Sequence, residues 1–551
     1  MRFMKKFIFL VSVIILFFLI YYSSEISELF LYFDSQNVTS LNNFFVTKDE
    51  IKSHLDKFRN NIDVESISLK LSVDMNNRKI FGTGIVAFRL NWEIKPVFNF
   101  DDEMKIKEVK LNSNKIKYER ENNFLSIDSV LQTGRLQTLK IQYSGSPDNG
   151  LYFYDRNSVK YLYSVNEPIF ASGWFACNDT PADKFMFTLQ VTVDSGYTAI
   201  SNGRKILDSL SGGKRKVLWE SSYPVASYLT ALYVGKYSRT SKTIIIGNDT
   251  LNMEIYSYPE DIKPARKTLS IAKDAVIQLC NFYGQYPFIK DKFAVVEIPW
   301  NYGGIENQTA IGIGENYFRS PEMFNDLLVH ETAHEWWGNS VGIKSWDDIW
   351  IDEGMANYSQ ALYWKGEAGN EAFKSTMLSM LNNALRKGKI RGRERNLFGK
   401  IVYDKSAWIF RMLNYELGDS VFIKSLKNYQ ALYKYKTGNA QKLKTVFEET
   451  SGKNLDRFFS QWIWDESGYI DLDCNFKMND NSRKIILDIR QKSEKTYTFI
   501  LPVGFYNHGE KIGEKNFRIN SKDTAITVGA AGCDSVAFDP DYTLLIKRKC
   551  K

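Results

Sequence analysis

The stretch from His330 to Glu353 reads HETAHEWWGNSVGIKSWDDIWIDE and opens with an HExxH motif. Two histidines four residues apart lie on one face of a helix, so both imidazoles can reach a single Zn²⁺ ion. Glu331 lies between them, where it can act as general base on a water beside the metal. The chain contains four histidines, His54, His330, His334 and His508. Because two of these four flank a glutamate in this pattern, chance is a poor explanation, and the sequence predicts one zinc ion per chain.

A third zinc ligand is expected at Glu353, with 18 residues between it and His334. That spacing leaves room for the first helix to end near Gly338, for a loop, and for a second helix that starts near Ile349 and brings Glu353 back to the metal. Two histidines and one glutamate leave an open position for water, which is the arrangement for metal-assisted hydrolysis. Taken alone, Glu353 could equally be a solvated carboxylate on a helix.

The composition is that of an ordinary globular protein with about three to four domains. Of the 551 residues, 44% are hydrophobic and 25% are charged. The net charge of 72 − 64 = +8 is modest for this length, so we expect no nucleic-acid partner. The five cysteines never form CxxC, which excludes zinc ribbons and thioredoxin-type motifs. Cys474 and Cys533 could pair in an oxidising compartment, but free thiols fit the sequence equally well.

The hydrophobic periodicity divides the chain into domains of a multidomain α+β protein. Short alternating runs separated by turn residues predict an N-terminal antiparallel β domain over residues 61–245. Helical spacing begins after Pro264 and predominates up to residue 468, which predicts a mixed, mainly helical catalytic domain over residues 246–468. Alternating runs return in residues 469–551 and predict a small C-terminal β domain.

The N-terminal segment predicts membrane attachment. Arg2, Lys5 and Lys6 precede an uncharged, apolar stretch from Phe7 to Ser24, and acidic residues follow it. This charge asymmetry predicts a cytoplasmic N-terminus with the remainder translocated. No small-x-small cleavage site follows the stretch, so we expect residues 1–24 to be an uncleaved anchor with an extracytoplasmic catalytic domain, and residues 25–60 to be a linker. The alternative is a signal peptide that is cleaved to leave a secreted or periplasmic protein.

A second motif, Gly303-Gly304-Ile305-Glu306-Asn307, precedes HExxH. The two glycines would let a strand approach a bound peptide closely, and Glu306 could pair with a free α-ammonium. Together with HExxH, 18 residues and a glutamate, this motif resembles the gluzincin zinc aminopeptidases, the family of aminopeptidase N and leukotriene hydrolase. Their pattern is Gly-x-Met-Glu-Asn, and Ile305 stands here in place of Met. The resemblance implies a thermolysin-like catalytic domain in which Glu306 binds the substrate's amino terminus.

Two further segments extend the resemblance into the predicted β domain. Tyr161-Leu-Tyr-Ser-Val-Asn-Glu167 places a glutamate where the family has Gln or Glu at the amino-terminus pocket, so Glu167 is expected to be a second α-amino contact. The family's usual Arg and Pro in this region are replaced by Ser172 and Ala176. Asn202-Gly203 matches the Ser-Asn-Gly turn that follows in the family.

Tyr403-Asp404-Lys405-Ser406-Ala407 resembles the family's Tyr-x-Lys-Gly-Ala, with Ser406 in place of Gly. The resemblance implies that Tyr403 donates a hydrogen bond to the oxyanion of the tetrahedral intermediate. Tyr403 also heads an apolar stripe, so a purely structural core tyrosine is the alternative. A basic run at residues 386–395 follows the usual pattern of a solvated loop, although it could instead border the cleft.

The sequence therefore predicts a zinc aminopeptidase that acts on peptides with a free N-terminus. A thermolysin-type endopeptidase would share HExxH without needing Glu306, and a non-catalytic peptide-binding protein could retain the scaffold alone. Only some 80 residues follow residue 470, so we expect the large helical C-terminal domain of many relatives to be missing and the cleft to be more open.

Overall fold

The computed structural model describes residues 62–550, except for residues 393–396, 466–467, 480–483 and 530–531. The predicted anchor, residues 1–24, and the predicted linker, residues 25–60, lie outside the described residues, as do Arg393 and Arg395 of the basic run. Within the described ranges, no helix combines the length and apolar character needed to cross a bilayer.

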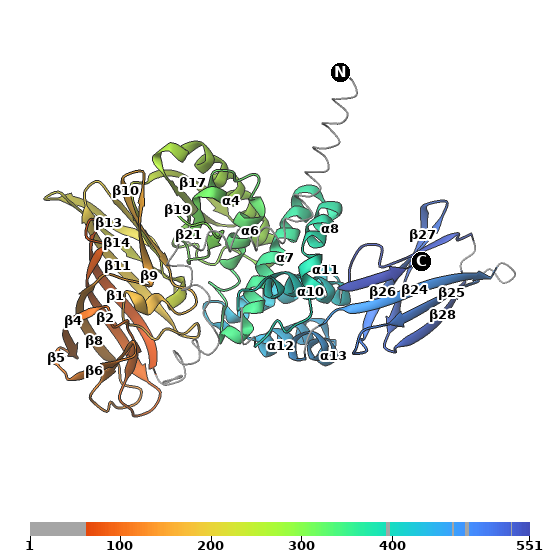
Figure 1. Ribbon diagram of the computed structural model, residues 1–551, viewed down its shortest axis with the longest axis horizontal. Coiled ribbons are helices and arrows are strands. Elements are labelled where there is room, and N and C mark those ends of the chain that lie inside the picture. The colour runs from red at the N-terminus through yellow and green to blue at the C-terminus, as the bar shows by residue number, and fades with distance from the viewer. Residues whose placement is uncertain (1–61, 393–396, 466–467, 480–483, 530–531, 551) are drawn as a thin grey trace, which may run out of the picture. The chain divides into compact units, whose positions relative to one another are not determined.

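The N-terminal domain is built on a large, mostly antiparallel sheet (Figure 1). The central strands alternate between buried and partly exposed residues, as in β8 (Gln137–Gly145), so one face of each packs into the core, whereas the edge strand β13 (Arg204–Ser211) is exposed throughout. β1 (Ile62–Asp74) pairs antiparallel with β2 (Lys79–Leu90) and parallel with β11 (Lys184–Asp194). In spatial order the strands are β13 (Arg204–Ser211), β14 (Lys214–Glu220), β11 (Lys184–Asp194), β1 (Ile62–Asp74), β2 (Lys79–Leu90), β8 (Gln137–Gly145), β4 (Lys105–Leu111) and β5 (Asn114–Lys115), and β15 (Val225–Ala226) pairs with β11.

Two smaller sheets complete this domain. A three-stranded sheet contains β3 (Val97–Asn99), β7 (Phe124–Ile127) and β6 (Tyr118–Glu121). A four-stranded sheet contains β12 (Thr198–Ser201), β16 (Leu232–Gly235), β10 (Val159–Val165) and β9 (Gly150–Arg156). Glu167 comes two residues after β10, and the Asn202-Gly203 turn comes directly after β12. This sheet therefore carries two of the segments that the sequence singled out.

The predicted catalytic domain, for which we keep that name, begins with a five-stranded sheet of β17 (Ser238–Ile246), β18 (Asp249–Ser257), β19 (Phe293–Ile298), β21 (Ile311–Gly314) and β20 (Gly304–Ile305). The predicted boundary at residues 245/246 falls inside this sheet, because β17 is its edge strand and pairs with β18 along its length. The domain therefore starts near Ser238. β17 is largely exposed, as β13 of the N-terminal domain is, and this pattern does not tell which sheet a strand joins.

The helices of the catalytic domain follow the sheet. α6 (Asn325–His334) packs on α7 (Ile349–Ala368), and α7 packs on α10 (Lys400–Leu417). α7 starts at Ile349, as predicted. α6 ends at His334, before the predicted Gly338. The turn after His334 departs from the α-helical hydrogen-bond pattern, because Asn339 N donates to His334 O, five residues back. The longer helices are α4 (Ile262–Tyr283), α6 (Asn325–His334), α7 (Ile349–Ala368), α8 (Asn370–Ser379), α10 (Lys400–Leu417), α11 (Asp419–Tyr433) and α12 (Ala440–Ser451). Short helices are α5 (Glu315–Phe318), α9 (Leu381–Ala384) and α13 (Asp456–Phe459).

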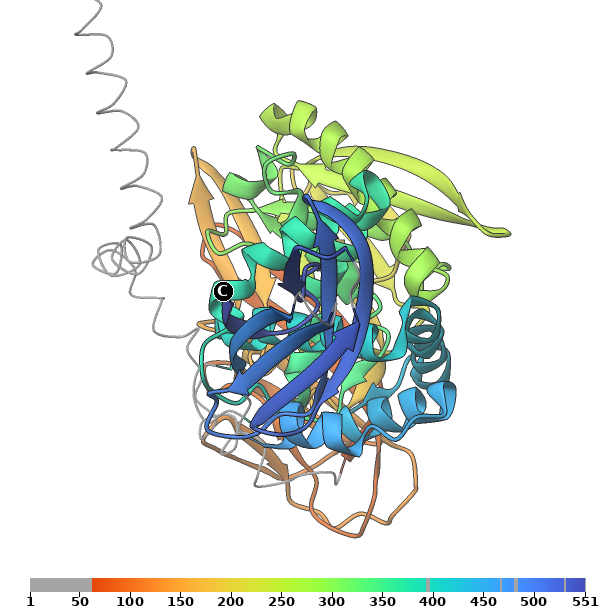
Figure 2. The same cartoon turned by 90° about the vertical axis from the view of Figure 1, so that its right-hand side faces the viewer.

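The C-terminal domain is a pair of β-sheets, drawn in blue in Figure 2. One sheet contains β28 (Asp523–Gly529), β25 (Lys484–Gln491), β24 (Ile470–Asn479) and β30 (Ile546–Cys550), and the other contains β27 (Glu510–Ile519), β26 (Phe499–Asn507) and β29 (Ser535–Phe538). Cys533 keeps a free thiol, which donates to Ser535 O at 3.1 Å. The Cys474–Cys533 disulfide considered from the sequence is therefore not formed.

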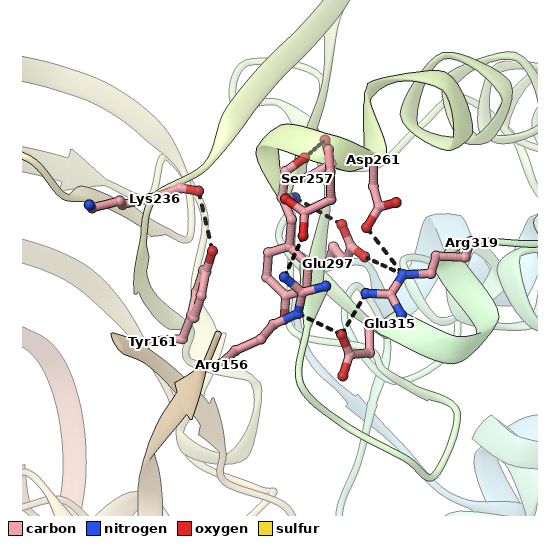
Figure 3. Close-up of polar contacts among 10 residues, drawn as sticks. Arg156, Tyr161, Lys236, Ser257, Asp261, Glu297, Glu315 and Arg319 are labelled. Atoms are coloured by element: carbon pink, nitrogen blue, oxygen red, sulfur yellow. Dashed lines mark hydrogen bonds and ion pairs between the residues drawn. The ribbon is translucent and has the colours of Figure 1, made fainter. Parts of the chain in front are cut away.

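An ion-pair cluster ties the N-terminal domain to the catalytic domain (Figure 3). Arg156, the last residue of β9, donates from Nε to Glu315 of α5 at 2.8 Å. Glu315 also accepts from Arg319 at 2.8 Å, and Arg319 donates to Asp261 at 3.2 Å. The Arg156 guanidinium lies 4.0 Å above the ring of Tyr258. The end of β9 is therefore held by charge-assisted bonds on the catalytic domain.

Candidate active site

The two histidines of HExxH and Glu353 converge on one point. α6 presents His330 and His334 one turn apart, and their Nε2 atoms are 3.1 Å from each other. Glu353, in the second turn of α7, places Oε2 at 3.3 Å from His330 Nε2 and 3.5 Å from His334 Nε2. All three side chains are buried. Their three donor atoms lie within 4.8 Å of one another, so the predicted ligand set forms a compact group.

The hydrogen bonds on the outer side of each imidazole show that this group fits a zinc ion. His334 Nδ1 is 3.0 Å from Trp337 O, which can only accept, so Nδ1 carries the proton and Nε2 keeps its lone pair. His330 Nδ1 is 2.8 Å from Asn357 Oδ1, and Asn357 Nδ2 donates to Asp404 at 2.8 Å. Both Nε2 lone pairs therefore face Glu353. Two imidazoles and a carboxylate with such supporting bonds are a zinc ligand set.

A second group of carboxylates overlaps the first. Glu167, Glu306 and Glu353 bring one oxygen each within 4.8 Å of one another, and we call these three residues the amino-terminus pocket. Burial raises the pKa of Glu167, and the charges of Glu306 and Glu353 raise it further. Within the described part of the chain, Glu167 Oε1 is buried without a hydrogen-bond partner. Three carboxylates this close together, with Glu353 buried and Glu167 half-buried, repel one another unless a cation joins them, so the pocket is suited to a positive group.

Glu331 lies against the backbone of the Gly-rich strand. A Cβ atom added at Gly304 would lie 2.4 Å from Glu331 Cδ, so only glycine leaves room for the carboxylate. Gly303 has φ +105°, a conformation that favours glycine. Burial raises the pKa of Glu331. The two glycines thus serve different purposes: Gly303 makes the turn and Gly304 makes space for Glu331.

We expect Gly304→Ala to lower kcat about 100-fold, because the added methyl group displaces the Glu331 carboxylate, and a misplacement of about 1 Å costs that much in a positioned site. The measurement is kcat on an aminoacyl-arylamide together with zinc content. Gly513→Ala is the matched control, since a Cβ at Gly513 meets nothing within 4 Å. Equal activity of the two variants would contradict this reading of Gly304.

Tyr403 reaches the same site from the first turn of α10. Its ring lies 5.9 Å from the ring of His330, with the planes 20° apart. Burial, followed by the surrounding carboxylates, raises the pKa of Tyr403, so its hydroxyl stays protonated and can donate. The structure therefore places Tyr403 beside the histidine pair instead of in an apolar core away from it.

The exchange of Gly for Ser at position 406 has a structural partner. A Cβ atom at Gly354 would lie 2.4 Å from the Cβ of Ser406. α7 and α10 therefore cross so closely that a side chain at 406 requires none at 354. Gly354 directly follows Glu353, so this close crossing also sets the position of the predicted third ligand.

In the described part of the basic run, Arg391 and Lys387 hold ion pairs. Arg391 donates to Asp348 at 2.8 Å, at the start of α7, and Lys387 pairs with Glu494 of the C-terminal domain. Neither contact involves a residue of the amino-terminus pocket.

Several supporting residues escaped the sequence reasoning. Asn357 follows Glu353 by four residues, so helical spacing could have placed it on the same face of α7. Asn339 donates to the backbone of Glu306 at 2.8 Å, and Lys184 donates to the backbone of Asn339 at 2.7 Å. Lys184 lies on β11 of the other domain, and no local pattern links it to the site.

Comparison with known proteins agrees with this geometry. Residues 59–229 match the peptidase M1 N-terminal domain, and residues 269–462 match the peptidase family M1 domain. A probable aminopeptidase 1 of Sulfurisphaera tokodaii is 27% identical over 65% of this chain and 48% of its own length. A leucyl aminopeptidase of Saccharolobus solfataricus is 24% identical, with the same two coverages of 65% and 48%. The chain spans about half the length of these curated relatives.

Among solved structures, Legionella pneumophila aminopeptidase A in complex with aspartic acid has the same fold. The TM-score is 0.78 at 17% identity, over 89% of this chain and 60% of that one. The order of domains, the HExxH helix and the distant glutamate define a protein of the gluzincin class. The chain belongs to the M1 peptidase family.

Proposed function

We propose that this protein is a zinc aminopeptidase that hydrolyses the first peptide bond of peptides with a free N-terminus. The observation that carries the proposal is the overlap of two groups: Glu353 belongs both to the His-His-Glu set and to the amino-terminus pocket. A substrate α-ammonium held by the carboxylates would therefore place the first peptide bond next to the metal position. The relatives' names, which are those of aminopeptidases, support the same activity.

The roles of the chain's own residues follow from this geometry. A zinc ion held by His330, His334 and Glu353 would polarise the scissile carbonyl and acidify a water. Glu331 would take the proton from the attacking water and deliver it to the leaving amine. Glu306 and Glu167 would accept hydrogen bonds from the α-ammonium and so fix which bond is cleaved.

We expect Tyr403→Phe to lower kcat about 10²- to 10³-fold with little change in KM, because the lost hydroxyl would donate to the developing oxyanion only. Steady-state kinetics on an aminoacyl-arylamide measure kcat and KM separately. Tyr415→Phe, on the same helix, is the control, since the Tyr415 hydroxyl bonds Asn516 of the C-terminal domain at 2.8 Å. A rise in KM at unchanged kcat would assign Tyr403 to binding instead.

A panel of matched free and N-acetylated aminoacyl-arylamides, assayed with and without chelator, tests the proposed function. We expect turnover of the free substrates only, its loss on chelation and its return with zinc. Cleavage of blocked internal bonds would instead indicate a thermolysin-type endopeptidase. Binding of peptides without any turnover would indicate a non-catalytic peptide-binding protein.

We also propose attachment to a membrane through residues 1–24, with the catalytic domain on the extracytoplasmic side. Arg2, Lys5 and Lys6 before the apolar stretch support this orientation. Fractionation of the full chain and of a chain lacking residues 1–24 tests it, and equal recovery of both in the soluble fraction would contradict it.

A further inference from the structure

Thr309 has a backbone conformation that is unusual for its side chain. Its φ is +62°, and the residue is fully buried, three positions after Glu306. A β-branched residue seldom occupies this left-handed region, and such strain persists only where the surroundings impose it. Glycine would adopt this conformation more easily, so the threonine side chain itself calls for a reason.

Three hydrogen bonds from three different elements hold Thr309. Gly203 N donates to Thr309 Oγ1 at 2.8 Å, from the turn after β12 in the N-terminal domain. Thr309 N donates to Glu335 Oε1 at 2.9 Å, directly after α6. Ala294 N donates to Thr309 O at 3.1 Å, from β19. The side-chain bond is the one that crosses between the two domains.

The turn that donates to Thr309 is itself fixed by a buried lysine. Lys292 of the catalytic domain donates to Ser201 O at 2.7 Å and to Gly203 O at 2.8 Å. Its ammonium also lies 4.5 Å above the ring of Trp219. Within the turn, Asn202 Nδ2 donates to Gln308 O at 2.6 Å. Lys292 therefore links the catalytic domain to the turn, and the turn links back to the segment that holds Thr309.

The bonds on Thr309 act on Glu306 through a short, closed turn. Ala310 N donates to Asn307 O at 2.9 Å, so residues 307–310 form a tight unit directly after Glu306. Asn307 Nδ2 donates to the hydroxyl of Tyr233, in β16 of the N-terminal domain, at 2.8 Å. A shift of Thr309 would therefore move the unit whose first residue adjoins Glu306.

We propose that Thr309 is a positioning residue for the amino-terminus pocket. Thr309 holds Glu306 in a fixed position relative to the N-terminal domain, which supplies Glu167. The Thr309 hydroxyl accepts the bond from Gly203 and so sets the separation of the two carboxylates that receive the α-ammonium. This inference rests on the proposed function, because it concerns how that ammonium is held. The residue acts through Glu306 and does not itself touch the substrate.

The test compares Thr309→Val with Thr309→Ser in the zinc-loaded full chain. Valine keeps the shape and strain but removes the acceptor, whereas serine keeps the hydroxyl. Two probes are titrated calorimetrically: alanine hydroxamate, which carries an α-ammonium, and acetohydroxamate, which has none. We expect Thr309→Val to raise the Kd for alanine hydroxamate about 10-fold, because Gly203 N loses its hydrogen-bond partner and the segment that carries Thr309 shifts. The Kd for acetohydroxamate should change less than about twofold in Thr309→Val. Thr309→Ser should bind both probes with Kd values within about threefold of the wild type.

Equal weakening of both probes, or of neither, by Thr309→Val would overturn the positioning role. Where Thr309→Val does not fold, Thr309→Gly replaces it, since glycine relieves the strain while still lacking the acceptor, and the same selective loss is expected. A wild-type chain that binds both probes equally would overturn the proposed function itself. These outcomes are distinct, because the second is read from the wild type and the first from the variants.

Discussion

Glu331→Gln is expected to lower kcat by about 10²- to 10⁴-fold, the contribution of a positioned general base and acid. The amide keeps the shape of the side chain and its packing against Gly304, but it cannot accept the proton of the attacking water. Glu331 lies between the two histidines on α6 and is not one of the three converging ligands, so zinc content should stay at one per chain. Steady-state kinetics and metal analysis on the same preparation measure both quantities.

The control for this variant is Glu322→Gln, since the Glu322 side chain is 64% exposed and lies outside the site. It should retain wild-type kcat. If Glu331→Gln kept most of its activity while binding zinc, another group would have to supply the base.

Glu353→Gln is expected to lower zinc affinity by more than about 100-fold, because partners that only support a ligand already cost 10- to 100-fold. Burial disfavours the charge of Glu353, yet the neighbouring histidines outweigh it and lower the pKa of this carboxyl to about 2. The group is therefore a carboxylate at neutral pH, and glutamine removes that charge from the metal position. Activity should fall with the bound zinc.

Thermal unfolding gives a second readout of this loss. At a zinc concentration 100-fold above the wild-type Kd, binding stabilises the fold by about 2.7 kcal/mol, and a 100-fold weaker site would retain about 0.4 kcal/mol. Glu367→Gln is the control, near the far end of α7. A variant that still gained the full zinc stabilisation would show that Glu353 is not a ligand.

The sequence predicted the features that depend on local spacing. The HExxH pair and the start of the second helix at Ile349 agree with the structure, because a helix has a fixed period and the apolar pattern follows it. The end of α6 at His334 differs from the expected Gly338, since the next turn changes its winding through backbone bonds that leave no mark on the pattern.

The features that depend on contacts between distant segments could not be read from the sequence. β17 looks like a strand of the N-terminal domain, and only its pairing with β18 assigns it to the catalytic sheet. The positive φ at position 309 could not be predicted, because the residue there is threonine and not glycine. The link from Lys292 to the turn after β12 joins residues 89 to 91 positions apart. In each case the local conformation or sheet membership depends on contacts with residues that are distant in the sequence.

The three proposed metal ligands all come from a single domain, whereas the amino-terminus pocket draws Glu167 from one domain and Glu306 from the other. If the boundary between the two domains were loosened, by a nick in the chain or by mild denaturant, selectivity for chain ends would therefore be lost before the bound ion. If the proposed function holds, such a partly opened molecule would still carry its metal and yet no longer recognise where a peptide begins.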